Sequence, residues 1–308
     1  MGLDSKELFT GPTVDGWSTG RTIEHYPCVP ESNAPDMQIG TLSMEMSPNR
    51  IEMTLDPTVS AIMTFHGEKV LANFALLGFS RLRVASEAAG ISVELVAVLD
   101  SADEETTRIV TTHPAIRPSD KVVKVHNGDL ASSRNDGIAR ASAPYVAILD
   151  GDDYYSKDWF TSALQTAKMA NGAVIVHPEL TISFGAIHCV AKTFNMDSES
   201  YPISSCMMVH PWVSCSFGAR DIYLRHPYQP THLRTTGFGY EDWHWNLETL
   251  AYGIKHVTAP RTALFYRRKA SSMVTEMAQN GATVRPSRFF DEPEKWQEWI
   301  YGSSGAIR

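Results

Sequence analysis

Three carboxylates, Asp150, Asp152 and Asp153, follow an apolar run in the stretch YVAILDGDDYYSKDWF. An Asp-Gly pair can serve as a plain turn, because Asp tolerates turns and Gly supplies a positive φ. Three like charges this close nevertheless repel one another unless a cation offsets them. Mg²⁺ and Mn²⁺ prefer oxygen ligands, and Mg²⁺ is usually held by one or two carboxylates together with substrate phosphates. The loop therefore predicts a metal-bridged diphosphate.

Other acidic residues stand at positions that a structural role would also explain. Asp100 closes a second apolar run, and it could cap the helix expected from Asp103 or accept a hydrogen bond from a nucleobase or a ribose. Glu241 and Asp242 begin a helical pattern, where the helix dipole stabilises acids. The residues alone leave these alternatives open.

Basic side chains form two candidate contacts. Arg134 shares a helix face with apolar residues four positions away on either side, so packing or solvation would explain it as well as a ligand would. Arg267, Arg268 and Lys269 follow an apolar strand pattern at residues 262–265. They fit either a surface cluster or a group that closes over phosphates opposite the metal.

The stretch from residue 201 to 245 is rich in aromatic and His residues, among them Trp212, Trp243 and Trp245. Such rings could stack on the apolar faces of sugars in an acceptor site. A satellite core beneath long loops is the alternative.

The elements that must position these residues begin at Pro57, where short β-branched runs alternate with helical patterns. This alternation is typical of βαβ units on a mainly parallel sheet. The predicted strands are Ser60–Phe65, Val93–Leu99, Lys121–Val125, Tyr145–Leu149, Ala173–Val176 and Thr262–Phe265. The predicted helices are Lys69–Ala88, Asp103–Thr111, Leu130–Ala141, Lys157–Ala170 and Glu241–Tyr252, with Asp129 as the N-cap of the third. Ligands of such sheets bind beyond the carboxyl ends of the strands, which is where the acidic loops fall.

Composition narrows the class of protein. The chain has 308 residues, 43% of them hydrophobic, and a formal net charge of −8. An acidic protein without a dense basic patch is not expected to bind nucleic acid. No apolar stretch of spanning length and no secretory signal is visible, so we expect no transmembrane segment and a cytoplasmic protein, or one bound peripherally at the inner face of a membrane. The cysteines, Cys28, Cys189, Cys206 and Cys215, show no metal or disulfide spacing and are predicted to be buried free thiols.

The order of the pieces TFHGE, LDSADEET, HNGDLASSRNDG, YVAILDGDD, GYEDWHWNL and YRRKASSMV resembles the family 2 inverting glycosyltransferases. The resemblance covers residues 57–275. It implies the GT-A fold: a Rossmann-like α/β architecture with a mainly parallel central sheet and flanking helices. It also implies a donor-binding half at 57–180 and an acceptor half with the catalytic base at 181–275. An irregular N-terminal extension at 1–56 and a C-terminal tail or helix at 276–308 would flank them.

The resemblance also implies residue roles. Asp242 matches the catalytic base, with Glu241 beside it, and Asp152 and Asp150 match the metal ligands. The donor-binding residues would be Phe65, Glu68, Asp100, Asn127, Arg134, Asp150, Gly151, Arg267, Arg268 and Lys269. The acceptor-binding residues would be Trp212, Trp243 and Trp245. Lys269 stands where many family members have a His. The first strand ends in the sequence Thr-Phe-His-Gly-Glu, which departs from the usual family pattern.

The implied reaction moves a sugar from a nucleoside-diphosphate sugar to a hydroxyl of a glycan, glycolipid or polysaccharide, with Mn²⁺ or Mg²⁺ as cofactor. UDP is the favoured nucleotide and dTDP the next. A non-catalytic GT-A module that binds a nucleotide sugar or glycan within a larger assembly is the alternative. The sequence does not specify the donor sugar, the acceptor, the linkage or the oligomeric state.

Overall fold

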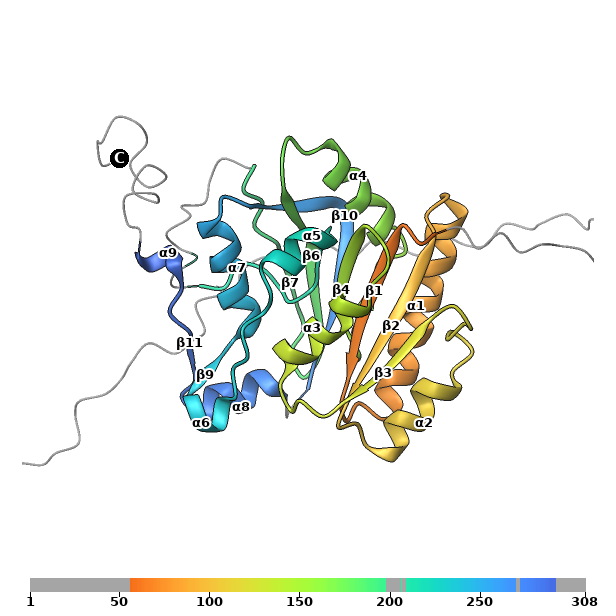
Figure 1. The fold of residues 1–308 in the computed structure, drawn as a ribbon, viewed down its shortest axis with the longest axis horizontal. Helices are drawn as coiled ribbons and strands as arrows, with labels where there is room; N and C mark the ends of the chain where they lie inside the picture. Colours follow the sequence, from red (N-terminus) through yellow and green to blue (C-terminus); the bar gives the residue numbers. More distant parts are fainter. Residues whose placement is uncertain (1–55, 198–205, 207–208, 270–271, 292–308) are drawn as a thin grey trace, which may run out of the picture. The chain divides into compact units, whose positions relative to one another are not determined.

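The computed structural model describes residues 56–197, 206, 209–269 and 272–291 (Figure 1). The chain separates into two units, Met1–Glu52 and Met53–Arg308, and the description concerns the second unit alone. The N-terminal extension and most of the C-terminal tail expected from the sequence lie outside the described residues.

A nine-stranded sheet in the order β3-β2-β1-β4-β8-β6-β10-β5, with β7 paired to β6, forms the centre of this unit. Its strands are β1 (Val59–Phe65), β2 (Val93–Asp100), β3 (Lys121–Val125), β4 (Tyr145–Asp150), β5 (Tyr154–Tyr155), β6 (Val174–Gly185), β7 (Cys189–Lys192), β8 (Ser216–Ala219) and β10 (Lys255–Arg268). The strands β1 to β4, β6 and β10 run in one direction, and β5, β7 and β8 run in the other. The mainly parallel α/β fold is confirmed. A smaller parallel pair joins β9 (Phe238–Gly239) to β11 (Thr283–Val284).

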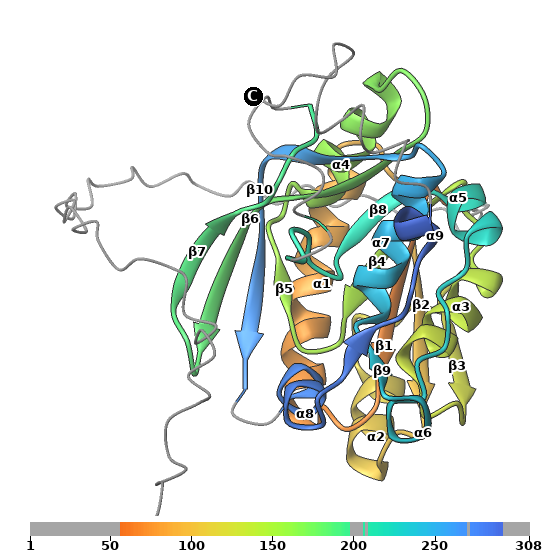
Figure 2. The same cartoon turned by 90° about the vertical axis from the view of Figure 1, so that its left-hand side faces the viewer.

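Helices lie on both faces of the sheet (Figures 1 and 2). They are α1 (Val70–Ala88), α2 (Glu104–Thr112), α3 (Leu130–Arg140), α4 (Trp159–Met169), α5 (Arg220–Arg225), α6 (Leu233–Thr236), α7 (Glu241–Ala251), α8 (Met273–Gln279) and α9 (Arg288–Asp291). One buried apolar cluster packs α1 and α4 on one face, and a second packs α3, α5 and α7 on the other. Successive residues of β1 enter opposite clusters, Met63 the first and Ile62 the second, because side chains alternate along a strand. Covered faces on both sides explain why β1 and β2 read as continuous apolar runs.

The helix that follows β1, α1, turns both small and large apolar side chains toward the sheet, including Leu76 and Leu82. Phe74 and Leu77 are exposed, whereas Ala72, Ala75 and Phe79 are buried. Small residues on the inner face allow the helix to approach the sheet closely. The apolar spacing predicted a helix over Lys69–Ala88, and the structure has one at Val70–Ala88.

Two aspartates cap the helices at the carboxyl edge of the sheet. Asp103 accepts a hydrogen bond from Thr106 N at 2.7 Å, so Asp103 and not Asp100 caps α2. Asp129 accepts from Ser132 N at 2.9 Å, which confirms it as the N-cap of α3.

The part of the chain after residue 180 differs most from the expected alternation. β6 extends well beyond the predicted Ala173–Val176, and β10 contains a bulge between Ala259 and Ala263. The short strand β8 inserts antiparallel between β4 and β6. Its four residues carry no strand pattern long enough to detect in the sequence.

The cysteine prediction is confirmed in part. Cys206 and Cys215 are buried free thiols, but Cys189 is exposed on β7. Cys28 lies outside the described residues. No helix in the described part of the chain is both long and apolar enough to cross a bilayer.

Candidate active site

The polar loops predicted from the sequence lie along one edge of the sheet. The strands β1, β2, β4 and β10 share a direction, so their carboxyl ends meet at that edge. Figure 2 shows the arrowhead of β10 on the side of the sheet where α6 and α8 lie. The long β10 thereby brings Arg267, Arg268 and Lys269 to the same edge as the loop after β4.

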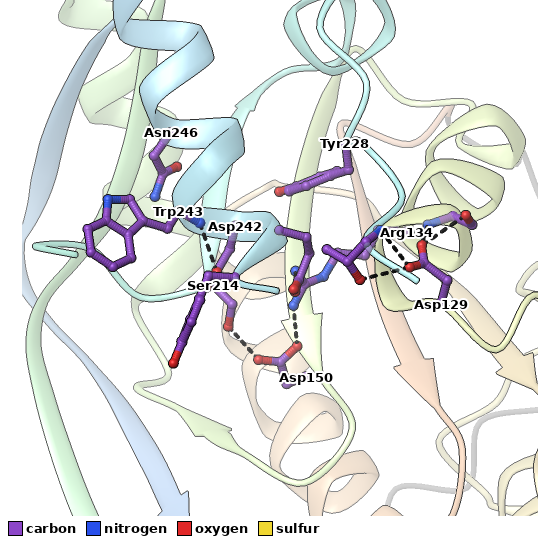
Figure 3. A network of polar contacts seen from close by, with 12 residues as sticks. Asp129, Arg134, Asp150, Ser214, Tyr228, Asp242, Trp243 and Asn246 are labelled. Carbon is purple, nitrogen blue, oxygen red and sulfur yellow. Dashed lines mark hydrogen bonds and ion pairs between the residues drawn. The ribbon is translucent and has the colours of Figure 1, made fainter. Parts of the chain in front are cut away.

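A buried arginine, Arg134 of α3, joins two carboxylates that are far apart in the sequence (Figure 3). Its Nη1 donates to Glu241 Oε1 at 2.8 Å, and its Nη2 donates to Asp150 Oδ1 at 3.0 Å. The side chain is 1% exposed, and its Cζ lies 5.5 Å from the centre of the Tyr228 ring. Burial disfavours the charged form, but the charges of Asp150 and Glu241 outweigh it and raise the pKa of Arg134. Arg134 is therefore an internal cation that connects the end of β4 to the start of α7.

Each carboxylate of the loop after β4 has its own partner. Asp150 also accepts a hydrogen bond from Ser214 Oγ at 2.5 Å (Figure 3), and Asp152 pairs with Lys269 Nζ at 2.5 Å. Asp153 is buried, and its Oδ1 accepts from Arg267 N at 2.7 Å. Burial and then the neighbouring charges of Asp152 and Asp150 raise the pKa of Asp153. Arg134 and Lys269 thus offset part of the repulsion among these carboxylates, for which the sequence predicted a metal ion.

The tight packing beneath this loop requires Gly151. A Cβ at this position would lie 2.5 Å from the carbonyl oxygen of Thr64 and 2.6 Å from the ring of Phe65. Phe65 is itself 1% exposed, so its predicted contact with the donor would require the ring to leave the core. Its position supports the loop from below.

Asp100 and Asn127 form an anchor for the start of α3. The Asp100 carboxylate accepts hydrogen bonds from the backbone N–H groups of residues 127, 128 and 129, and from the hydroxyls of Ser101 and Ser133. Asn127 donates to Ser133 Oγ at 3.2 Å and to Asp136 Oδ2 at 2.8 Å. The carboxylate oxygens of Asp100 therefore already accept hydrogen bonds from groups of the protein itself. Asp100 therefore shapes the loop that a nucleotide would meet.

The remaining predicted donor residues lie close to the same edge. Glu68 accepts from His66 N at 2.6 Å; burial raises its pKa, while hydrogen bonding and the charge of Lys269 oppose the shift. The guanidinium of Arg267 lies over the rings of Phe184 and Tyr154, at 4.7 and 5.5 Å. Arg268 lies over the Tyr266 ring at 5.4 Å. The Arg267 guanidinium also donates from Nε to the Asp152 carbonyl oxygen at 3.1 Å, whereas Lys269 pairs with the Asp152 carboxylate itself.

The first turn of α7 carries the predicted base. Asp242 Oδ1 accepts from Trp243 N at 2.8 Å (Figure 3). The neighbouring Glu241 is held by Arg134. Burial raises the pKa of both carboxyls, and the charge of Asp242 adds to the shift of Glu241. Arg134 opposes both shifts. Glu241 therefore forms the direct ion pair with Arg134, and Asp242 does not.

The three predicted acceptor rings have different surroundings. Trp245 is 1% exposed and stacks on Tyr223 and Tyr228, and Trp212 is 3% exposed and donates from Nε1 to Phe194 O at 2.9 Å. Neither ring offers a face to a sugar, so the prediction is wrong for these two and the core interpretation holds. Trp243 alone is partly exposed.

A chain of buried histidines lies behind Ser214. His177 Nδ1 donates to Cys215 O at 2.9 Å, so its Nε2 must accept from His256 Nδ1 at 2.9 Å. His256 Nε2 in turn accepts from Thr249 Oγ1 at 2.9 Å. Both imidazoles are neutral in this arrangement, and burial lowers the pKa of His177 to about 3 and holds the pKa of His256 well below its usual value. The chain connects α7 to the segment that presents Ser214 to Asp150.

These histidines predict an acid-sensitive fold. Between the ordinary histidine pKa of 6.5 and about 3, the unfolded chain binds a proton at His177 that the folded chain does not, so stability falls as the pH falls. The loss approaches about 1.4 kcal/mol per pH unit for each such histidine. Urea unfolding at pH 7 and pH 5 should show a smaller loss in His177→Asn, which can keep the bond to Cys215, than in the wild type. Equal losses would contradict the assignment.

The residues fit a divalent metal only together with a donor diphosphate. Among the described residues, no three His, Cys, Asp or Glu side chains converge to hold an ion. Asp150 is occupied by Arg134 and Ser214, whereas Asp152 has one oxygen on Lys269 and offers a carboxylate. One carboxylate with substrate phosphates is a usual Mg²⁺ environment.

Ser214, His210 and Asn246 lie at this site and were not expected there from the sequence, whereas Tyr228 belongs to the aromatic stretch that was expected to line an acceptor site. His210 lies 4.0 Å from Asp242 and 2.9 Å from Asn246. Only the aromatic and His-rich composition of residues 201–245 pointed to the region. Their roles depend on contacts across the fold, which no local spacing reveals.

The mainly parallel sheet, its flanking helices and the acidic edge agree with the GT-A fold that the resemblance implies. Residues 60–186 match the family model for Glycosyl transferase family 2, so the prediction that the chain carries such a domain is confirmed. The curated uncharacterized glycosyltransferase EpsJ of Bacillus subtilis (strain 168) is 30% identical over 76 residues, which are 25% of this chain and 22% of that protein. The match thus spans about a fifth of that relative.

Two solved structures share the fold at low sequence identity. TarS residues 1–349 from S. aureus, in complex with UDP-GlcNAc, gives a TM-score of 0.57 at 14% identity over 80% of this chain and 67% of that one. The mannosyltransferase PcManGT from Pyrobaculum calidifontis, in complex with GDP-Man and Mn²⁺, gives 0.50 at 14% identity over 81% and 71%. These likenesses support the GT-A fold.

Proposed function

We propose that this chain is a metal-dependent inverting glycosyltransferase that moves a sugar from a nucleoside diphosphate to a hydroxyl of a glycan, glycolipid or polysaccharide. The observation that carries the proposal is the bridge from Asp150 through Arg134 to Glu241. It places the acidic loop expected to hold the diphosphate beside the turn that presents Asp242. The family match and the nucleotide sugars bound by TarS and PcManGT support the donor class.

Asp242 would take the proton of the acceptor hydroxyl as it attacks the anomeric carbon from the face opposite the diphosphate. Burial raises its pKa, which makes the carboxylate a stronger base than an exposed aspartate. Glu241 is paired with Arg134 and would orient this turn. Trp243, half-buried beside the base, is the ring available to an acceptor sugar.

The leaving diphosphate needs positive charge on the opposite side. Asp152 would hold the divalent ion, which when bound neutralises charge on the diphosphate. Lys269, which pairs with Asp152, would contribute positive charge to phosphates held beside the same carboxylate. Arg267 and Arg268 lie over aromatic rings at the same edge and are less direct candidates.

The test is thermal unfolding with UDP, dTDP, GDP or CMP, each with Mn²⁺, Mg²⁺ or EDTA. A nucleotide at about 100 times its Kd should stabilise the protein by about 2.7 kcal/mol, which raises the midpoint by several degrees. We expect a shift with UDP or dTDP that EDTA removes and that Asp152→Ala lacks.

The matched control is Asp158→Ala, which removes an exposed aspartate paired with Lys157 and should keep the shift. A folded wild-type protein that responds to none of the nucleotides would contradict the proposal. Binding without release of nucleoside diphosphate from any sugar donor would instead favour a non-catalytic module.

A further inference from the structure

His210 contacts three residues of α7 at the proposed catalytic turn. Asn246 Nδ2 donates to His210 Nε2 at 2.9 Å, and His210 Nδ1 lies 4.0 Å from Asp242 Oδ2. Asp242 and Asn246 are four residues apart and so share one face of the helix, as Figure 3 shows for these two labelled residues. The imidazole stacks on the Trp243 indole with centroids 5.5 Å apart and planes within 7°. The contacts with Asn246 and Trp243 therefore fix the orientation of the His210 ring.

These contacts fix which nitrogen carries the proton. An amide NH₂ can only donate, so His210 Nε2 must be the unprotonated nitrogen and the proton of a neutral ring lies on Nδ1. Burial lowers the pKa of His210 to about 3, so the ring is neutral at physiological pH. The 4.0 Å contact is consequently not an ion pair. The protonated Nδ1 of a neutral ring lies near a carboxylate oxygen, beyond hydrogen-bond distance.

We propose that His210 is a positioning residue for Asp242: its Nδ1–H orients the Asp242 carboxylate for proton abstraction, and Asn246 fixes the tautomer that makes this possible. The inference rests on the proposed function, because it assigns a role toward the proposed base. Asp242 Oδ1 is already held by Trp243 N. A donor at Oδ2 would fix the rotation of the carboxylate while leaving a lone pair for the acceptor hydroxyl. Such contacts in ligand-free sites often tighten when the substrate binds.

The decisive comparison uses two substitutions that each place an amide nitrogen where one of the two ring nitrogens lies. In His210→Asn the amide nitrogen can occupy the place of Nδ1, whereas in His210→Gln it can occupy the place of Nε2. We expect His210→Gln to lower kcat for release of nucleoside diphosphate from the sugar donor about 10- to 100-fold, because a misplaced base loses its geometry. His210→Asn should retain most of the rate, and both should keep the nucleotide-induced thermal shift.

An activity-independent readout accompanies the kinetics. Nitrogen-15 NMR of the wild-type histidines, with the His210 signals assigned by their loss in His210→Asn, should show the Nδ1–H tautomer. The Nε2–H tautomer, or wild-type kcat in both variants, would overturn the role. Loss of kcat in both variants together with the nucleotide shift would also overturn it, since that pattern indicates a purely structural residue.

The two proposals fail in different ways. A wild-type protein that neither binds nucleotides nor turns over a sugar donor contradicts the proposed function, and the role of His210 falls with it whatever its tautomer. A wild-type protein that turns over donor while His210→Gln matches its rate contradicts the role of His210 alone.

Discussion

Replacing Asp242 by asparagine should lower turnover about 10²- to 10⁴-fold and leave nucleotide binding nearly unchanged. Asparagine keeps the shape of the side chain and can still accept from Trp243 N, but it cannot take a proton from the acceptor. The charge next to Arg134 is retained on Glu241, which makes the direct ion pair. The measurement is the rate of nucleoside diphosphate release, with and without acceptor, beside the thermal shift with nucleotide and metal.

The control for this substitution is Asp221→Asn. Asp221 is an exposed aspartate on α5 that pairs with Arg225 four residues later, so its loss should change neither readout. An Asp242→Asn protein that keeps wild-type turnover would remove Asp242 as the base. A protein that loses nucleotide binding as strongly as turnover would place Asp242 in the donor site instead.

Replacing Arg134 by methionine should lower the free energy of unfolding by about 3–5 kcal/mol. Removing one partner of a buried ion pair leaves the other charge uncompensated, and Arg134 has two such partners in Asp150 and Glu241. Methionine fills much of the same volume, so the expected loss comes mainly from charge and not from a cavity. Urea unfolding at neutral pH measures the effect.

A second substitution separates the charge effect from the packing effect. In the double variant Arg134→Met/Glu241→Gln the buried Glu241 charge is gone, so part of the lost stability should return. Arg225→Ala removes an arginine from an exposed pair, and such pairs contribute at most about 1 kcal/mol. If Arg134→Met costs no more than Arg225→Ala, the bridge is not the connection that holds β4 to α7.

Short-range sequence signals were enough to predict the secondary structure of much of the donor-binding half. The first strand was expected at Ser60–Phe65 and is Val59–Phe65, and the N-cap at Asp129 was placed correctly. Apolar periodicity and capping chemistry act over a few residues, so a single sequence contains them. The same signals failed for β8, which is a strand only because β4 and β6 pair with it.

Burial was harder to infer than secondary structure. Trp212 and Trp245 looked suited to stack on sugars, yet both lie in the core. An aromatic side chain has the same identity in a core and in a binding site. The difference depends on which elements cover it, and those elements come from distant parts of the chain.

The sequence by itself determined that acidic residues stand at the carboxyl ends of successive strands, because each strand and its loop are set by neighbouring residues. It thereby determined that Asp150 and Asp152 would face the expected ligand edge. Only the tertiary structure decided their partners: Arg134 links Asp150 to Glu241, which lies 107 residues after Arg134 in the chain, and Ser214 and Lys269 complete the set. Charge pairing in a buried site depends on the positions of whole helices and strands, and those positions follow from packing of the entire core.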